Sequence, residues 1–128
     1  MTNELALTRI GGVYTIHRLP PDKPVQKNIL AADFYAIVRT TEELSVVCPV
    51  EVPINNSQRQ DGWVGLKVEG PLDFDLKGIL AGLTTVLAHA DVSVYVLSSY
   101  DTDYLFVRSP SFEDAVEALR AAGYRVTL

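Results

Sequence analysis

The stretch VSVYVLSSYDTDYLFVRSPSFEDAVEALRAAGYRVTL, residues 92–128, decides the fold. Two apolar runs in it, residues 92–97 and 104–107, are rich in β-branched and aromatic side chains and predict neighbouring strands. The apolar residues that follow recur at helical spacing. A last apolar run, residues 124–128, predicts a third strand. The order in this stretch is therefore strand, strand, helix, strand.

The predicted helix carries end signals at both termini. Ser111 is of the type that caps a helix, and Glu113 and Asp114 would lie in the first turn, where negative charge favours the helix dipole. Gly123 would stop the helix, because the residue after a helix often adopts the left-handed conformation.

A strand and a helix precede this stretch. Residues 63–69 alternate between apolar and polar positions, which predicts a strand with one buried face, and residues 76–89 show helical spacing. The C-terminal half, residues 61–128, thus has the order β-α-β-β-α-β of the ferredoxin-like fold. We expect an α+β protein, with an antiparallel sheet of four strands here and both helices on one face.

The first half, residues 1–60, reads as a reduced, strand-rich version of the same unit. Residues 5–10 and 13–19 show the alternation of side chains that is typical of strands. Gly11 and Gly12 between them suit a tight hairpin turn. Residues 51–61 are polar and predict a linker or exposed loop.

Local sequence patterns predict two further features of this half. Residues 34–38 (FYAIV) predict a buried strand, and another strand, residues 44–48, ends before a proline. Thr40 and Glu43 have capping-box spacing, which predicts a short helical turn between them.

The composition limits the class of protein. The chain has 128 residues, with 11 basic and 16 acidic side chains, so 11 − 16 gives a net charge of −5. Without a basic cluster, nucleic acid is not expected as a partner. A single cysteine, Cys48, excludes an internal disulfide, and no apolar run is long enough for a membrane span. We expect a cytoplasmic protein without a cofactor or metal.

Two glycines mark the start of the predicted helix at 76–89. Gly78 and Gly82 lie four residues apart and would share one face. A helix N-terminus also offers free N–H groups to a carboxylate or phosphate. The alternative is that Gly78 simply begins the helix while Gly82 packs against a strand.

The connection at residues 98–104 (SSYDTDY) crowds hydroxyl groups and carboxylates between two strands. Asp103 could receive an ammonium group and Ser99 could hydrogen-bond a ligand. Such residues also form polar turns locally, which is the alternative interpretation. A positive helix end and a nearby carboxylate would together suit an α-amino acid.

Catalytic alternatives are weaker. Asp73 and Asp75 have the spacing of a phosphatase nucleophile pair, but Leu76 and Lys77 follow where that motif needs other residues. Cys48 reads as a small buried hydrophobic residue. His17 and His89 show no metal-ligand spacing, and no nucleophile elbow or phosphate-binding loop is present in the sequence.

The residues GILA (78–81) and YDTDY (100–104), with FYAIVRTTEELSVVCP (34–49), resemble the ACT-domain family and, within it, the CASTOR-type subfamily. The resemblance covers roughly residues 5–128. It implies a tandem pair of ACT-like units, residues 1–60 and 61–128, with a regulatory, non-enzymatic role.

The resemblance also implies a site for an amino acid or similar small metabolite at a unit or subunit interface. Its loop and helix start match Asp73, Leu76, Gly78 and Ile79, and its strand ends match Ser99, Tyr100 and Asp103. The arginine sensor of the subfamily has glycine in place of Asp73 and glutamate in place of Leu76, so arginine need not be the ligand. A homodimer would complete the site. The alternative is a protein-interaction module with a vestigial ligand site.

Overall fold

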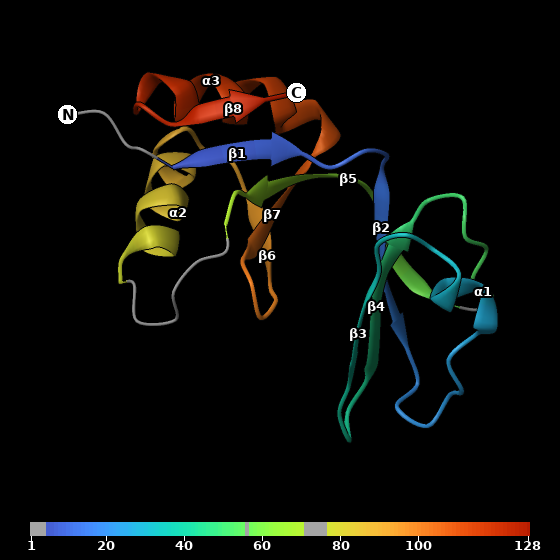
Figure 1. The fold of residues 1–128 in the computed structure, drawn as a ribbon. Helices are drawn as coiled ribbons and strands as arrows, with labels where there is room; N and C mark the ends of the chain where they lie inside the picture. The colour runs from blue at the N-terminus through green and yellow to red at the C-terminus, as the bar shows by residue number, and fades with distance from the viewer. Residues whose placement is uncertain (1–4, 56, 71–76) are drawn as a thin grey trace. The chain divides into compact units, whose positions relative to one another are not determined.

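The computed structural model describes residues 5–55, 57–70 and 77–128. The described chain forms two compact units (Figure 1). Residues 12–63 form the inserted unit, and residues 5–11 together with 64–128 form the terminal unit. The sequence predicted a single boundary near Asp61. The structure divides the chain twice, because its first strand belongs with the C-terminal half.

The terminal unit has the predicted β-α-β-β-α-β order. Its elements are the last part of β5 (Gln58–Val68), α2 (Ile79–His89), β6 (Val94–Ser98), β7 (Asp103–Arg108), a 3₁₀ turn (Ser109–Ser111), α3 (Phe112–Ala121) and β8 (Arg125–Thr127), together with β1 (Ala6–Arg9). The strands lie in the order β6-β7-β5-β1-β8. The fold is therefore α+β with a mostly antiparallel sheet, as predicted.

Strand β1 (Ala6–Arg9) is a fifth strand that the sequence did not assign to this sheet. It lies between β5 and β8, with Leu7 opposite Val68 in an antiparallel pair and opposite Val126 in a parallel pair. The predicted hairpin across Gly11 and Gly12 is wrong, because β1 pairs with β5 and β8. Leu7 is fully buried, so burial of its side chain favours this position.

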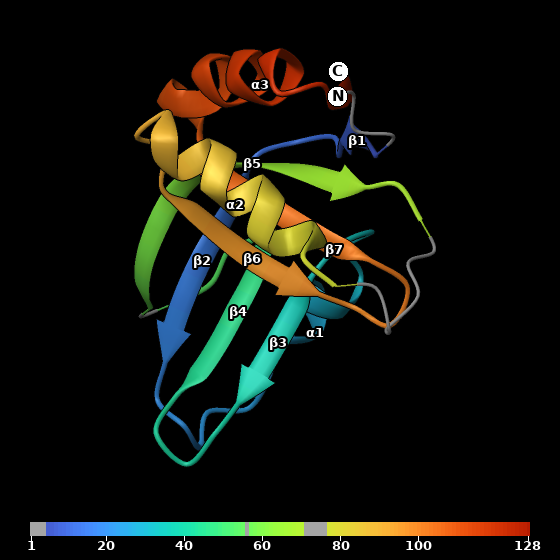
Figure 2. The ribbon, with the colours of Figure 1, turned by 90° about the vertical axis from the view of Figure 1, so that its left-hand side faces the viewer.

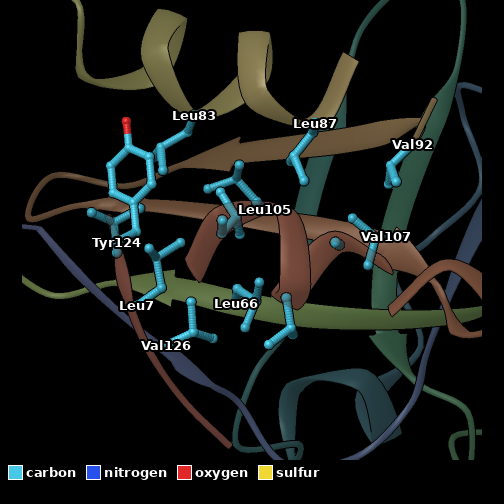
Figure 3. Close-up of a cluster of buried hydrophobic side chains, with 13 residues drawn as sticks. Leu7, Leu66, Leu83, Leu87, Val92, Leu105, Val107, Tyr124 and Val126 are labelled. Atoms are coloured by element: carbon cyan, nitrogen blue, oxygen red, sulfur yellow. The ribbon is translucent and has the colours of Figure 1, made fainter. Parts of the chain in front are cut away.

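One hydrophobic cluster joins the two helices to the sheet of the terminal unit (Figure 3). Leu83 and Leu87 of α2 meet Leu105 of β7, and residues of α3 and β8 complete the cluster. Both helices therefore cover the same face, as predicted. The side chains of Ile10 and Phe106 pack closely against the backbone of Gly65 in β5. An added Cβ there would lie 2.7 Å from the Cδ1 atom of Ile10, so no larger residue fits without a shift.

The two long helices end in the same way. After α3, Gly123 has φ of 97°, its N–H donates to the carbonyl of Arg120, and the N–H of Tyr124 donates to that of Leu119. This is the Schellman arrangement and confirms the predicted stop. Ser111 is the N-cap of α3, as predicted, but its side chain makes no capping bond and its backbone is helical rather than extended.

The inserted unit is built from four strands and a four-residue helix. These are β2 (Tyr14–Leu19), α1 (Lys27–Leu30), β3 (Ala36–Arg39), β4 (Leu44–Pro49) and the first part of β5, in the order β3-β4-β2-β5. Strand β5 begins at Gln58, so the predicted linker at 51–61 ends four residues earlier than expected. A register shift faces Gly62, whose φ is 80°, as expected for a β-bulge.

Two local interpretations in this unit need correction. The buried strand predicted at residues 34–38 is β3, Ala36–Arg39, which begins two residues later and is not buried, since Val38 is 52% exposed. The capping chemistry of Thr40 is real, since its Oγ accepts hydrogen bonds from the N–H groups of Glu42 and Glu43, at 3.1 Å each. These bonds close a turn between β3 and β4 rather than start a helix.

Candidate functional site

The β6–β7 connection is a tight turn closed by its own polar groups. The N–H of Ser99 donates to the carbonyl of Thr102 at 2.8 Å, and the hydroxyl of Ser99 donates to the same carbonyl at 3.1 Å. Tyr100 lies at the tip with 82% of its surface exposed. Ser99 thus serves the turn, as in the alternative interpretation of this segment.

Asp103 begins β7 directly opposite Ser98, the last residue of β6. The Ser98 hydroxyl donates to Oδ1 of Asp103 at 2.6 Å, a distance typical of a strong charge-assisted hydrogen bond. Asp103 is half-buried, so its carboxylate is held in place and still reached from solvent. A carboxylate in this position can accept further hydrogen bonds from an ammonium group.

Thr102 is a residue of this turn that the sequence reasoning missed. It is buried, and its Oγ1 donates to the carbonyl of Val68 at the end of β5. This bond ties the β6–β7 turn to the point where the chain leaves β5 for α2. The threonine stands in the quoted YDTDY motif, but its partner lies 34 residues away and left no local signal.

The start of α2 is defined by Gly78. It is the N-cap with φ of 79°, it makes no side-chain cap, and its carbonyl accepts the first helical bond, from Gly82 at 2.9 Å. The N–H groups of Ile79 and the next two residues precede that bond and can bind an anion.

Gly78 and Gly82 fit the interpretation that each glycine has a structural role in the helix and its packing. A Cβ at Gly78 would meet nothing within 4 Å, so the glycine serves the left-handed backbone. A Cβ at Gly82 would lie 3.0 Å from the hydroxyl oxygen of Tyr124, so this glycine makes room for a packed side chain.

The start of α2 and the β6–β7 turn lie at the same end of the terminal unit (Figures 1 and 2). Five of the predicted site residues therefore gather at one end. They are Gly78, Ile79, Ser99, Tyr100 and Asp103. Asp73, Asp75 and Leu76 lie outside the described residues. This end offers helical N–H groups for an anion and a carboxylate for a cation.

The inserted unit carries two buried groups of possible chemical interest. Cys48 is fully buried, and burial raises its pKa to about 11, so the thiol stays protonated and is a poor nucleophile. His17 is also buried, with its Nδ1 atom 2.8 Å from the Ser57 hydroxyl. In the part of the chain that the structure describes, no group of three or more histidine, cysteine, aspartate or glutamate side chains could hold a metal.

The family model described as "ACT domain" matches residues 58–121, which is half of the chain and includes both segments of this end. The chain belongs to the ACT domain family. A second model, for an N-terminal domain, matches residues 12–55, almost the whole inserted unit. No curated protein sequence matches the chain.

Solved structures agree with this ACT assignment. A protein from Agobacterium tumefaciens is 30% identical, with a TM-score of 0.91 over 99% of this chain and 95% of its own. A Vibrio cholerae protein described as a possible transport protein is 20% identical, with a TM-score of 0.74 over 93% and 90%.

The regulatory subunit of aspartate kinase from Thermus thermophilus is 11% identical, with a TM-score of 0.64 over 95% of this chain and 99% of its own. The sequence identities to the Vibrio cholerae and Thermus thermophilus proteins are low, so these two structures show similarity of fold alone. None of the helices among the described residues has the length and apolar character needed to cross a membrane.

Proposed function

We propose that this ACT protein is a non-enzymatic regulatory module that binds an amino acid or a similar small metabolite. The observation that carries the proposal is the position of the ACT match. It includes both the start of α2 and the β6–β7 turn, which lie at one end of the terminal unit. The similar fold of the Thermus thermophilus protein, a regulatory subunit of aspartate kinase, gives further support.

In this proposal the ligand carboxylate binds the N–H groups at Gly78 and Ile79, because a helix N-terminus attracts negative charge. The ligand ammonium group binds Asp103, whose orientation is held by Ser98. Ser99 and Tyr100 line the same end, and Asp73 and Leu76 are proposed for the loop before α2. The cytoplasm is the proposed location.

A thermal-shift measurement with the twenty amino acids, each in turn, tests the proposal. A ligand at 100 times its dissociation constant stabilises the folded state by about 2.7 kcal/mol. In a chain of this size the midpoint should rise by roughly 3–7 °C. We expect one class of amino acids to produce this shift in the natural protein.

The variant Asp103→Asn should lose the shift, because it keeps the shape of the side chain and removes its charge. Ser98→Ala is the matched control, since it removes only the hydroxyl that orients the carboxylate and should retain a weaker shift. An unchanged shift in Asp103→Asn would remove Asp103 from the site.

A second candidate is a protein-interaction module without a ligand. The observation in its favour is that Ser99 and Asp103 already make hydrogen bonds within the hairpin. A flat screen with all twenty amino acids, on protein that unfolds cooperatively, would favour this candidate.

A further inference from the structure

A groove lies along one flank of α3 in the terminal unit. Its volume is about 290 Å³, near the lower end of the range for binding sites in proteins. The lining residues are Phe112, Glu113, Val116, Glu117, Arg120 and Leu128. All but the last belong to α3, so the helix forms one side of the groove and the residue after β8 forms the other. The described residues of the candidate site are not among them.

The floor of the groove is apolar and anchored in the core. Val116 is buried in the hydrophobic cluster of the terminal unit, and Phe112 packs against that cluster. The Arg9 guanidinium lies 5.2 Å from the centroid of the Phe112 ring, a cation–π contact that helps to hold the ring. Leu128 is 68% exposed and gives the opposite side an apolar surface. The floor is therefore formed before any partner binds.

The charged groups around the groove differ in whether they have partners. The Arg120 guanidinium donates to the Val126 carbonyl at 2.7 Å, and the Arg9 guanidinium already contacts an aromatic ring. Glu113 and Glu117 are exposed, and neither forms an ion pair or a side-chain hydrogen bond with a residue that the structure describes. Like charges four residues apart on a helix repel each other. A cation placed between these two carboxylates would relieve that repulsion.

The two carboxylates also define a spacing. Residues four apart in an α-helix are separated by about 6 Å along its axis. In an extended chain, alternate residues are about 6.6 Å apart and point to the same side, while the residue between them points to the other side. An extended segment with a basic residue on each side of an aliphatic one matches the groove. Its basic side chains face Glu113 and Glu117 on the helix, and its aliphatic side chain faces Leu128.

We propose that this groove docks an extended segment of a partner protein in which two basic residues flank an aliphatic one. The groove suits a passing chain because three of its lining residues, Glu113, Glu117 and Leu128, are exposed, whereas a small-molecule site encloses most of its ligand. Complementary charge selects the partner and speeds its association. The proposal does not depend on amino-acid binding, because it rests on the groove alone.

NMR titration of the ¹⁵N-labelled full chain with three capped peptides tests the proposal. The first peptide is Gly-Ser-Lys-Leu-Lys-Ser-Gly. The second has glutamate in place of both lysines, and the third has serine in place of the leucine. We expect the first peptide to shift the amide resonances of α3 and of residues 126–128. The other two should bind more weakly, the glutamate peptide by at least about tenfold.

A double variant tests the role of the carboxylates. Glu113→Gln with Glu117→Gln should bind the lysine peptide about three- to tenfold more weakly, because two exposed ion pairs are lost. Glu42→Gln with Glu51→Gln is the matched control, since both glutamates are exposed in the inserted unit and the net charge changes equally. This control should bind like the natural protein. Far-UV circular dichroism and thermal unfolding establish that each variant is folded.

Leu128→Ser tests the apolar side of the groove. It should also weaken binding of the lysine peptide, while the preference for lysine over glutamate should persist. A variant that binds the lysine peptide as tightly as the natural protein would show that the leucine of the peptide does not face Leu128, contrary to the proposal.

Two further measurements distinguish other occupants. If n-butylammonium chloride binds as tightly as the lysine peptide, the groove is a site for small amines and the proposal is overturned. If the resonances of α3 and residues 126–128 change on dilution without peptide, a second copy covers the groove, and the proposal is again overturned. It also fails if the lysine peptide leaves these resonances unchanged, or binds the Glu113→Gln, Glu117→Gln variant as tightly as the natural protein.

Discussion

At the scale of single residues, His17 couples the inserted unit to pH. It is 2% exposed on β2, and its Nδ1 atom lies 2.8 Å from the Ser57 hydroxyl. Its Nε2 atom has no hydrogen-bond partner among the described residues. Burial lowers the pKa of His17, Arg59 lowers it further, and Asp61 opposes the shift. The folded protein therefore favours the neutral imidazole.

Acidification should destabilise the protein through this residue. Because the pKa of His17 is lower in the folded state than its ordinary value of 6.5, the unfolded chain binds the proton first. The contribution of neutral His17 to the free energy of unfolding should be fully present above pH 7. It should decrease as the pH falls through 6.5. One proton can contribute at most about 1.4 kcal/mol per pH unit.

Urea unfolding at several pH values between 7.5 and 5 measures this slope. The variant His17→Asn should lose less stability on acidification than the natural protein, although it starts from a lower value. Equal slopes for natural protein and His17→Asn would assign the pH dependence to other groups.

At the scale of elements, α2 and α3 end in the same hydrogen-bonded arrangement with different residues at its left-handed position. In α3 the residue is Gly123, and in α2 it is Asp91, with φ of 60°. The N–H of Asp91 donates to Ala88 and that of Val92 to Leu87. A side chain in this conformation costs free energy that glycine avoids, and an acid at a helix C-terminus is unfavourable.

Asp91→Gly should therefore raise the free energy of unfolding by about 0.5–1 kcal/mol. Gly123→Ala is the reverse change, in α3, and should lower the free energy of unfolding by about 1 kcal/mol. Both values follow from urea unfolding at pH 7. A loss of stability in Asp91→Gly would mean that the carboxylate makes a favourable contact that outweighs the backbone term.

At the scale of the whole molecule, the terminal unit is discontinuous in sequence. Residues 64–128 supply most of its elements, but β1 lies inside its sheet between β5 and β8. Without residues 5–11 the edges of β5 and β8 would be unpaired, and the core would lose Leu7. Loss of such a buried leucine alone costs about 2–5 kcal/mol.

A fragment of residues 64–128 should consequently fail to unfold cooperatively. A matched chain in which a short glycine–serine linker replaces residues 12–63 keeps β1 and should unfold with a sharp transition. Far-UV circular dichroism during heating compares the two. Equal transitions in both would show that β1 is dispensable for this unit.

The candidate site was predictable only in part. The polar hairpin at Ser99 and Asp103 stood out because carboxylates and hydroxyl groups crowd between two apolar strands. The bond from Thr102 to Val68 did not, because it joins residues that are far apart in the chain. The roles of Asp73 and Leu76 remain predictions.

The sequence by itself determined the elements of residues 62–128, the Schellman stop at Gly123 and the burial of Cys48. These depend on side-chain periodicity and on the conformational preferences of single residues, which act locally. Only the tertiary structure decided that β1 joins β5 and β8 and that the turn at Thr40 closes a hairpin. Strand partners are chosen by hydrogen bonds and burial between distant segments, and a local pattern does not record which segment will be the partner.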